Sequence, residues 1–167
     1  MQYHMLYPSP LGQLLLISDG SSLTGLWMDK VPPPESIPGE EIPVLLQTKG
    51  WLDAYFRGEQ PRLTIPLAPE GTPFQKRIWQ FLLEVPYGGT CTYGELAGRA
   101  AEAMGKERMS SQAVGGAVHR NPISIIIPCH RCIGADGTLT GYAGGLQRKQ
   151  WLLRHEGRKG TEEYDHQ

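Results

Sequence analysis

The sequence lacks the features that would direct a protein into a membrane or out of the cell. No apolar run in its 167 residues approaches the ~20 that a membrane helix needs. The first residues show no basic region followed by an apolar stretch, so no secretion signal is expected. Only three cysteines are present, an odd number that does not make a disulfide framework. We therefore expect a globular, cytoplasmic protein with no membrane partner.

The net charge of the chain is close to zero, but its charged residues are unevenly distributed along the sequence. The formal net charge is −1. Residues 1–70 carry four Lys/Arg and eight Asp/Glu, a net −4, whereas residues 71–160 carry twelve and six, a net +6. Such an asymmetry is a hint that the basic half binds a polyanion. An uneven solvated surface would give the same pattern, so charge alone leaves both interpretations open.

The first part of the chain has the pattern of a small sheet with a helix. Short apolar stretches at residues 1–7, 14–18 and 23–28 are separated by proline and glycine turns, which indicates antiparallel strands. A helix is expected over about 40–57, and residues 62–69 would link it to the second part.

The second part is predicted to be mostly helical. Thr72 and Gln75 match a capping box at the start of the first helix. Further helices are expected over about 93–104, 111–120 and 146–156, with Gly157 ending the last one. The β-branched run 124–127 is interpreted as a buried extended segment.

These patterns predict an α+β fold. It has a small N-terminal α/β domain over residues 1–70, with a short antiparallel sheet plus a helix. A mostly helical C-terminal domain with a helix-turn-helix follows over residues 71–157, and residues 158–167 are expected to be a disordered tail.

The second helix of the predicted helix-turn-helix is poor in side chains. Ala113, Gly116 and Ala117 are assigned to one face, and Val114 and Val118 to the opposite, buried face. A face of this kind allows the backbone to approach another surface closely. Tight helix–helix packing is the commoner explanation of such a pattern.

The segment 127–132 concentrates the reactive side chains. A cysteine acts as a nucleophile only as its thiolate, and at an ordinary pKa of ~8.5 little thiolate exists at neutral pH. His130 and Arg131 adjoin Cys129 and could raise that fraction. Three alternatives remain: Cys129 as a small buried hydrophobe, Cys129 and Cys132 as a redox pair, and the same residues with His119 as a zinc site. The late, helical setting disfavours a redox pair, and the lack of a second cysteine pair disfavours zinc.

Three blocks resemble the O6-alkylguanine-DNA alkyltransferases. The block 121–131 contains the proline-cysteine-histidine-arginine core, the block 141–157 follows it, and residues 74–94 match as well. The resemblance is strong over about residues 72–157 and looser before them. It implies stoichiometric, irreversible transfer of an alkyl group from O6-alkylguanine in double-stranded DNA to the protein's own cysteine, without a cofactor. O4-alkylthymine is left open as a second lesion, and a monomer is expected.

The resemblance also implies roles for individual residues. Cys129 would be the alkyl acceptor, and His130, through a water, would form with Glu156 the relay that generates its thiolate. Tyr93 would favour base flipping and protonate the departing guanine, and Asn121 would order the turn around the site. The guanine pocket would be lined by Tyr142, Ala143 and Gly144. The implied DNA contacts are Gln112, Ala113, Gly116, Ala117, Arg120 and Arg131.

The sequence departs from the family pattern at three points. Gln112 stands where an arginine usually fills the gap left by the flipped base, and Ala143 stands where several relatives carry serine. No cysteine precedes Cys91, so the zinc site of some relatives is not expected. Two other functions are alternatives: a lesion-binding module, which would lack the acceptor cysteine, and a thiol-disulfide oxidoreductase, which would require Cys132.

Overall fold

The computed structural model describes residues 1–139, 141–142 and 144–157, which form two compact units. The first unit comprises residues 1–70 together with 122–126, and the second comprises 71–121 and the residues from 127 onward. The tail predicted to be disordered lies outside the described residues. Residues 122–126 therefore pack with the N-terminal part of the chain, although they lie far from it in the sequence.

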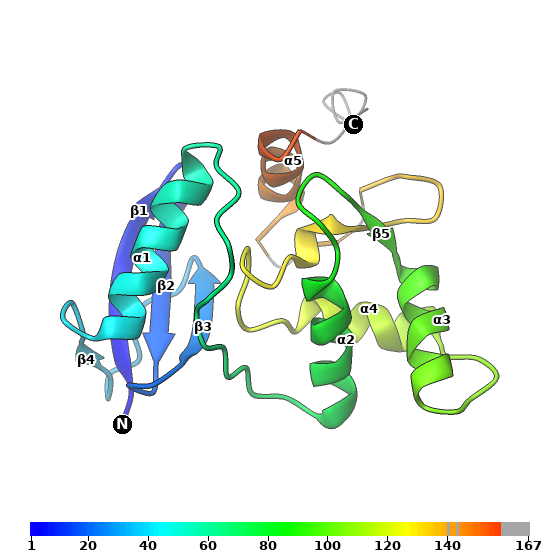
Figure 1. Ribbon diagram of the computed structural model, residues 1–167, viewed down its shortest axis with the longest axis horizontal. Helices are drawn as coiled ribbons and strands as arrows, with labels where there is room; N and C mark the ends of the chain where they lie inside the picture. Colours follow the sequence, from blue (N-terminus) through cyan, green and yellow to red (C-terminus); the bar gives the residue numbers. More distant parts are fainter. Residues whose placement is uncertain (140, 143, 158–167) are drawn as a thin grey trace. The chain divides into compact units, whose positions relative to one another are not determined.

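A four-stranded sheet forms the centre of the first unit (Figure 1). Its strand order is β3-β2-β1-β4, with antiparallel pairs along β1–β2–β3 and a short parallel pair between β1 and β4. The strands are β1 (Tyr3–Ser9), β2 (Gly12–Ser18), β3 (Leu23–Met28) and β4 (Ile37–Pro38). Gly12, at φ +102°, closes the tight turn between β1 and β2, a conformation that glycine adopts without strain.

The helix α1 (Pro43–Phe56) packs against β1, β2 and β3 in the first unit. Leu45 and Leu52 of this helix are completely buried. Residues 122–126 pair with the edge of the sheet along β3. The Leu26 N–H donates to the Pro122 carbonyl at 2.8 Å, and the Ser124 N–H donates to the Leu26 carbonyl at 3.1 Å.

In its described residues, the second unit contains four α-helices, one short 3₁₀ turn and a two-stranded parallel sheet. Its elements are α2 (Pro73–Leu83), β5 (Cys91–Thr92), α3 (Tyr93–Ala103), α4 (Ser111–His119), η1 (Cys129–Arg131), β6 (Cys132–Ile133) and α5 (Leu146–His155). The helices α2, α3 and α4 contact one another pairwise. The Trp79 indole on α2, which is fully buried, donates to the Ala117 carbonyl on α4 at 2.8 Å.

The predicted α+β fold class is confirmed, and so are several details. The Thr72 hydroxyl accepts from the Gln75 N–H at 3.1 Å, and the Gln75 side chain accepts from the Thr72 N–H at 3.0 Å, so the capping box exists. Gly157, at φ +80°, follows the last helix as expected.

The interpretation of residues 124–127 as an extended segment was wrong. They are buried, but they form a sequence of turns. Ile125 has φ +70°, a left-handed conformation that is unusual for a β-branched residue. The apolar composition of this segment predicted its burial correctly. Its backbone conformation depends on contacts with residues distant in the sequence, which a local pattern does not reveal. Strained backbone of this kind gathers at functional sites.

Candidate active site

Cys129 begins η1, the single 3₁₀ turn that follows the strained segment. The Cys129 N–H donates to the Ile127 carbonyl at 2.8 Å, which folds the chain back on itself just before the turn. The buried Asn121 donates its side-chain amide to the same carbonyl, also at 2.8 Å. Asn121 is therefore placed to order the turn.

The Cys129 thiol is in a desolvated setting. The residue is 5% exposed, and burial raises the pKa of the thiol above its usual value. A hydrogen bond from Asn121 and the positive charge of Lys149 act in the opposite direction and lower that pKa. Because burial has the larger effect, the resting thiol is protonated at neutral pH, and nucleophilic attack requires a base.

His130 and Arg131, which follow Cys129 on η1, form a buried trio with Glu156. The His130 Nε2 lies 2.7 Å from Glu156 Oε2, and both side chains are fully buried. The Arg131 guanidinium donates to both oxygens of Glu156, with Nε to Oε1 at 2.7 Å and Nη2 to Oε2 at 3.1 Å. The carboxylate thus accepts from two sides, and this arrangement fixes both partners.

The ionisation states follow from these contacts. Burial alone would raise the pKa of Glu156, but the hydrogen bonds from His130 and Arg131 and the charge of the Arg131 guanidinium outweigh it and hold that pKa well below its usual range. Burial lowers the pKa of His130, against the attraction of Glu156. We assign an ionised Glu156 paired to Arg131 and a neutral His130, because a carboxylate that forms a bidentate pair with a guanidinium stays charged.

This assignment determines the tautomer of His130. An ionised carboxylate only accepts hydrogen bonds, so His130 Nε2 must carry the proton. In a neutral imidazole the other nitrogen, Nδ1, is then an acceptor. His130 Nδ1 is buried and has no hydrogen-bond partner among the described residues. A buried basic nitrogen is thus available on the residue adjacent to the thiol.

Arg131 requires a correction, because it was expected to contact DNA. Its side chain is buried, and its Nη1 donates to the Val85 carbonyl at 2.7 Å while the rest of the guanidinium binds Glu156. These contacts use three of the five N–H donors of the guanidinium and hold it inside the protein. Arg131 instead holds Glu156 in place and keeps it ionised.

Only part of the predicted small-residue face of helix α4 is accessible to solvent. Ser110 caps it by accepting from the N–H groups of Gln112 and Ala113 at 3.1 and 3.2 Å. Gln112 and Ala113 are exposed and Gly116 is half-buried. The exposed Arg120 folds back on its own helix, where its Nη1 donates to the Gly116 carbonyl at 3.3 Å.

Ala117 also requires a correction. It was assigned to the DNA-facing side, but it is 3% exposed. Its neighbours in the buried set are Val114 and Val118, and its carbonyl accepts the Trp79 indole. The packing of α4 on α2 therefore uses Ala117, and the small-residue face open to solvent is narrower than predicted.

Tyr93 is the first residue of α3, directly after the cap residue Thr92. Its hydroxyl lies 3.4 Å from His119 Nε2, and the two rings meet edge to face at 6.2 Å. A methyl group added at Gly115 would lie 3.8 Å from the Tyr93 ring, so the ring runs along α4. The structure thus brings Tyr93 together with the predicted DNA-facing helix.

The predicted guanine-pocket residues lie on the segment before α5. The Gly145 N–H donates to the Tyr142 carbonyl at 2.9 Å, and Arg148 donates to the Gly144 carbonyl at 3.2 Å. Ala143 lies outside the described residues.

Lys149 is a buried residue that the sequence analysis did not single out. Its ammonium is fully buried and donates to the Cys132 carbonyl at 2.5 Å and to the Gly141 carbonyl at 3.5 Å. It therefore joins the strand after the acceptor turn to the pocket segment. The signal was present in the sequence: Lys149 shares the spacing of Leu152 and Leu153, the buried face of α5.

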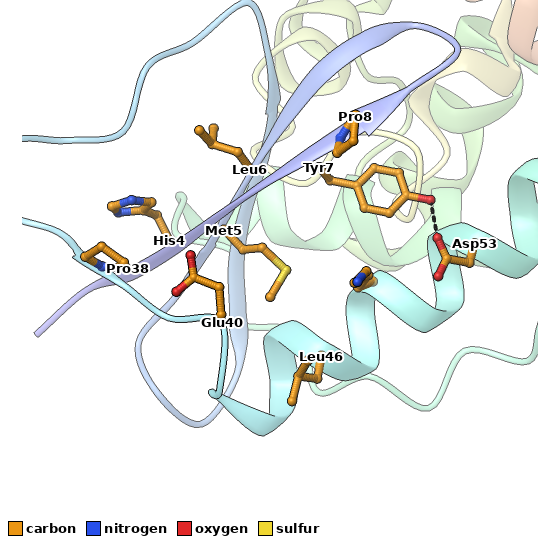
Figure 2. A pocket seen from close by; sticks show the side chains of 10 residues that line it. His4, Met5, Leu6, Tyr7, Pro8, Pro38, Glu40, Leu46 and Asp53 are labelled. Atoms are coloured by element: carbon orange, nitrogen blue, oxygen red, sulfur yellow. Dashed lines mark hydrogen bonds between the residues drawn. The ribbon is translucent and has the colours of Figure 1, made fainter.

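A separate cavity lies in the first unit. It has a volume of about 460 Å³, and Figure 2 shows it between β1 and α1, where the Tyr7 hydroxyl donates to Asp53 at 2.6 Å. It is lined by none of the predicted site residues. Within the described ranges, no group of three His, Cys, Asp or Glu side chains is arranged to hold a metal ion. No helix in that part of the chain combines the length and apolarity of a membrane span.

The fold and the site define a class: a helical domain in which a buried cysteine is followed directly by a histidine that is hydrogen-bonded to a buried glutamate. Comparison with known families agrees. Residues 73–158 match the 6-O-methylguanine DNA methyltransferase, DNA binding domain, and residues 2–69 match its ribonuclease-like domain. The chain belongs to the 6-O-methylguanine DNA methyltransferase family.

Individual relatives are similar over nearly the whole chain. The methylated-DNA–protein-cysteine methyltransferase of Haemophilus influenzae is 48% identical over 158 residues, covering 92% of this chain and 86% of the relative. That of Methanosarcina acetivorans is 45% identical, covering 93% and 98%. The crystal structure of Mycobacterium tuberculosis OGT in complex with DNA is 40% identical and covers 92% of each chain, with a TM-score of 0.80.

Proposed function

We propose that this protein repairs DNA by direct reversal, moving an alkyl group from the O6 atom of guanine to Cys129. The observation that carries this proposal is the buried Nδ1 of His130, the residue that follows Cys129: it has no hydrogen-bond partner among the described residues, and Glu156 holds the other ring nitrogen. Family membership supplies the reaction class, since the similar curated proteins are methylated-DNA–protein-cysteine methyltransferases. The hydrogen-bonding of His130 supports its role as the base that a protonated thiol needs.

The reaction follows from the ionisation states. His130 Nδ1 takes the thiol proton through one bridging water, and ionised Glu156 stabilises the resulting imidazolium. The Cys129 sulfur then attacks the alkyl carbon, a sulfur–carbon bond forms, and the carbon–O6 bond breaks. The departing guanine takes a proton from Tyr93. The thioether is stable and no second nucleophile removes it, so one molecule repairs one lesion.

The proposed partner is double-stranded DNA with an O6-alkylguanine, bound by a single copy of the chain. Gln112, Ala113 and Gly116 lie on the accessible part of α4, where small side chains let the backbone approach a minor groove. Tyr93 lies against this helix, next to the position at which a base would leave the stack. Arg120 would reach a phosphate by releasing its contact with Gly116.

The flipped guanine would be held by the segment that precedes α5. Tyr142, Ala143 and Gly144 are the proposed lining residues. Because Lys149 connects this segment to the Cys132 carbonyl, the pocket and the acceptor turn are held by a common side chain. The thiol must stay reduced to react, which suits the cytoplasmic location inferred from the cysteine count.

The decisive experiment is intact mass spectrometry after incubation with a duplex that carries one O6-methylguanine. We expect the protein to gain one methyl group, located on Cys129 by peptide mapping, with at most one equivalent of DNA repaired. Cys129→Ser should abolish transfer and retain DNA binding, whereas Cys132→Ser should retain transfer. Methylation at another residue, or sustained turnover beyond one equivalent, would overturn the proposal. Loss of transfer in Cys132→Ser would favour the oxidoreductase alternative.

A further inference from the structure

Cys91 and Cys132 lie opposite each other in the two-stranded parallel sheet. They are register partners on β5 and β6, and both are free and buried. Cys91 is 7% exposed and Cys132 is fully buried. The reaction proposed above uses neither of these thiols.

Their placement matches the requirements of a disulfide. Neighbouring strands lie about 4.8 Å apart, and cysteines joined by a disulfide have Cα atoms roughly 4.4 to 6.8 Å apart. The two side chains already contact, because their thiols share a hydrogen bond. The Cys129 thiol has a different hydrogen-bond partner, Asn121. The sequence motif at 129–132 suggested pairing Cys132 with Cys129, whereas the strand register pairs it with Cys91.

The two thiols are chemically unequal. The hydrogen bond from Cys132 lowers the pKa of Cys91, and it outweighs the opposing effect of burial; the charge of Lys149 acts in the same direction as the hydrogen bond. That same hydrogen bond and burial raise the pKa of Cys132. Cys91, which is also the more exposed of the two, is the thiol that reaches the reactive thiolate form first.

We propose that Cys91 and Cys132 are a disulfide-forming pair that a peroxide oxidises, separate from the acceptor Cys129. The Cys91 thiolate attacks a peroxide oxygen, the O–O bond breaks, and Cys91 becomes a sulfenic acid while the leaving oxygen is released as water. The Cys132 sulfur then attacks the Cys91 sulfur, the S–O bond breaks, and a second water leaves. Two thiols are oxidised by two electrons, and one hydrogen peroxide is reduced to two waters.

The cross-link would join two segments of the proposed active site. Cys91 precedes Tyr93 by two residues, and Cys132 directly follows η1, which carries Cys129. The closed loop contains α3, α4 and the acceptor turn, so oxidation should stabilise this part of the chain. Because the partner strands are already in register, the acceptor turn should keep its geometry. The odd cysteine left over is then the acceptor.

The test is oxidation of the full chain with hydrogen peroxide, followed by blocking of free thiols with iodoacetamide and non-reducing peptide mapping. We expect a Cys91–Cys132 cross-linked peptide, a carbamidomethylated Cys129, and a melting temperature higher by about 5 °C that dithiothreitol reverses. Cys91→Val and Cys132→Val, which suit a strand, should each lose the cross-link and the shift. A Cys129–Cys132 peptide, or three free thiols in the oxidised wild type with melting curves confirming the fold, would overturn the pairing. Neither result depends on alkyl transfer, so this test stands apart from the proposed function.

Discussion

The His130 Nε2 lies 2.7 Å from the Glu156 Oε2, and both side chains are fully buried from solvent. The carboxylate accepts, so the imidazole donates from Nε2 and keeps a lone pair on Nδ1. The consequence is chemical as well as structural, because the orientation and the tautomer of the histidine are set by a residue 26 positions away in the sequence. Glu156 also forms an ion pair with Arg131, and its negative charge compensates the buried positive charge of the guanidinium.

The first prediction concerns Glu156→Gln. A glutamine oxygen would accept from Arg131, so its amide would face His130 and require an unprotonated Nε2. The proton would move to Nδ1, and the base would be lost. We expect single-turnover transfer from a free O6-alkylguanine base to Cys129 to slow by about 10²- to 10⁴-fold, the usual contribution of a general base.

The same variant needs a check on folding, because removing a buried charge partner costs about 3–5 kcal/mol. Urea unfolding and transfer rate are therefore measured on the same sample, at a urea concentration where the variant is fully folded. An unchanged rate in the folded variant would remove Glu156 from proton transfer and leave it only the role of holding Arg131.

The second prediction is the pH dependence of stability. The pKa of His130 is lowered in the folded state from 6.5, so the unfolded chain binds its proton first as the pH falls. The pKa of Glu156 is lowered from 4.5, so its contribution is present above pH 4.5 and is lost as the pH falls toward the folded-state pKa. Stability should therefore decline below about pH 6.5 by up to ~1.4 kcal/mol per pH unit per proton, and more steeply below pH 4.5.

Urea unfolding from pH 4 to 8 measures this curve, with His130→Asn as the comparison. The variant should lose the decline between pH 6.5 and 4.5 and keep the one below it. A wild-type curve that is flat across the first interval would show that His130 is protonated in the folded protein, contrary to the assigned tautomer.

The third prediction concerns Asn121→Ala. The change removes the hydrogen bond to the Ile127 carbonyl, which should cost about 1–3 kcal/mol of stability. It also removes the hydrogen bond that lowers the pKa of Cys129. Transfer at pH 7 should slow, and the rising limb of the pH–rate profile should shift to higher pH.

Thr72→Ala is the matched control for that variant. It loses a helix cap and about 1 kcal/mol of stability, yet Thr72 lies outside the active site. Its pH–rate profile should coincide with that of the wild type. If both variants shift the profile alike, the effect on Asn121→Ala comes from lowered stability and not from the thiol.

The fourth prediction concerns Gln112, which is exposed near the start of α4. Gln112→Arg should stabilise a flipped-out base with a longer, charged side chain and speed repair of duplex DNA about tenfold, equivalent to ~1.4 kcal/mol in the barrier. The free-base reaction needs no flipping and should not change. Gln112→Ala should slow only the duplex reaction, and equal changes with both substrates would show that Gln112 has no part in flipping.

The sequence allowed the local part of the fold to be predicted because its signals are local. The capping box at Thr72, the glycine after α5 and the helix limits at Tyr93 and Ser111 all depend on neighbours a few residues away. The family resemblance supplied Cys129, His130 and Glu156 as a group. It did not supply their ionisation states, which require distances and burial.

Errors arose where tertiary contacts override the local pattern. Arg131 was among the DNA contacts implied by the resemblance, but its guanidinium donates to the buried Glu156 carboxylate and to the Val85 carbonyl. Ala117 was assigned to the open face of α4, and the Trp79 indole on another helix shows that it is covered. The left-handed Ile125 could not be anticipated, because no residue preference favours that conformation.

The placement of residues 122–126 in the first unit bears on how this chain could be divided. The backbone passes between the units three times, after residues 70, 121 and 126. A gene fragment that ends at residue 70 would leave the Leu26 N–H and carbonyl without their partners Pro122 and Ser124. A fragment that begins at residue 71 would carry Ile123, Ile125 and Ile126, all buried in the intact protein, with nothing to cover them. Because residues 122–126 belong to the first unit, expression as halves divided at residue 70 should yield aggregation-prone fragments that recover structure only when combined.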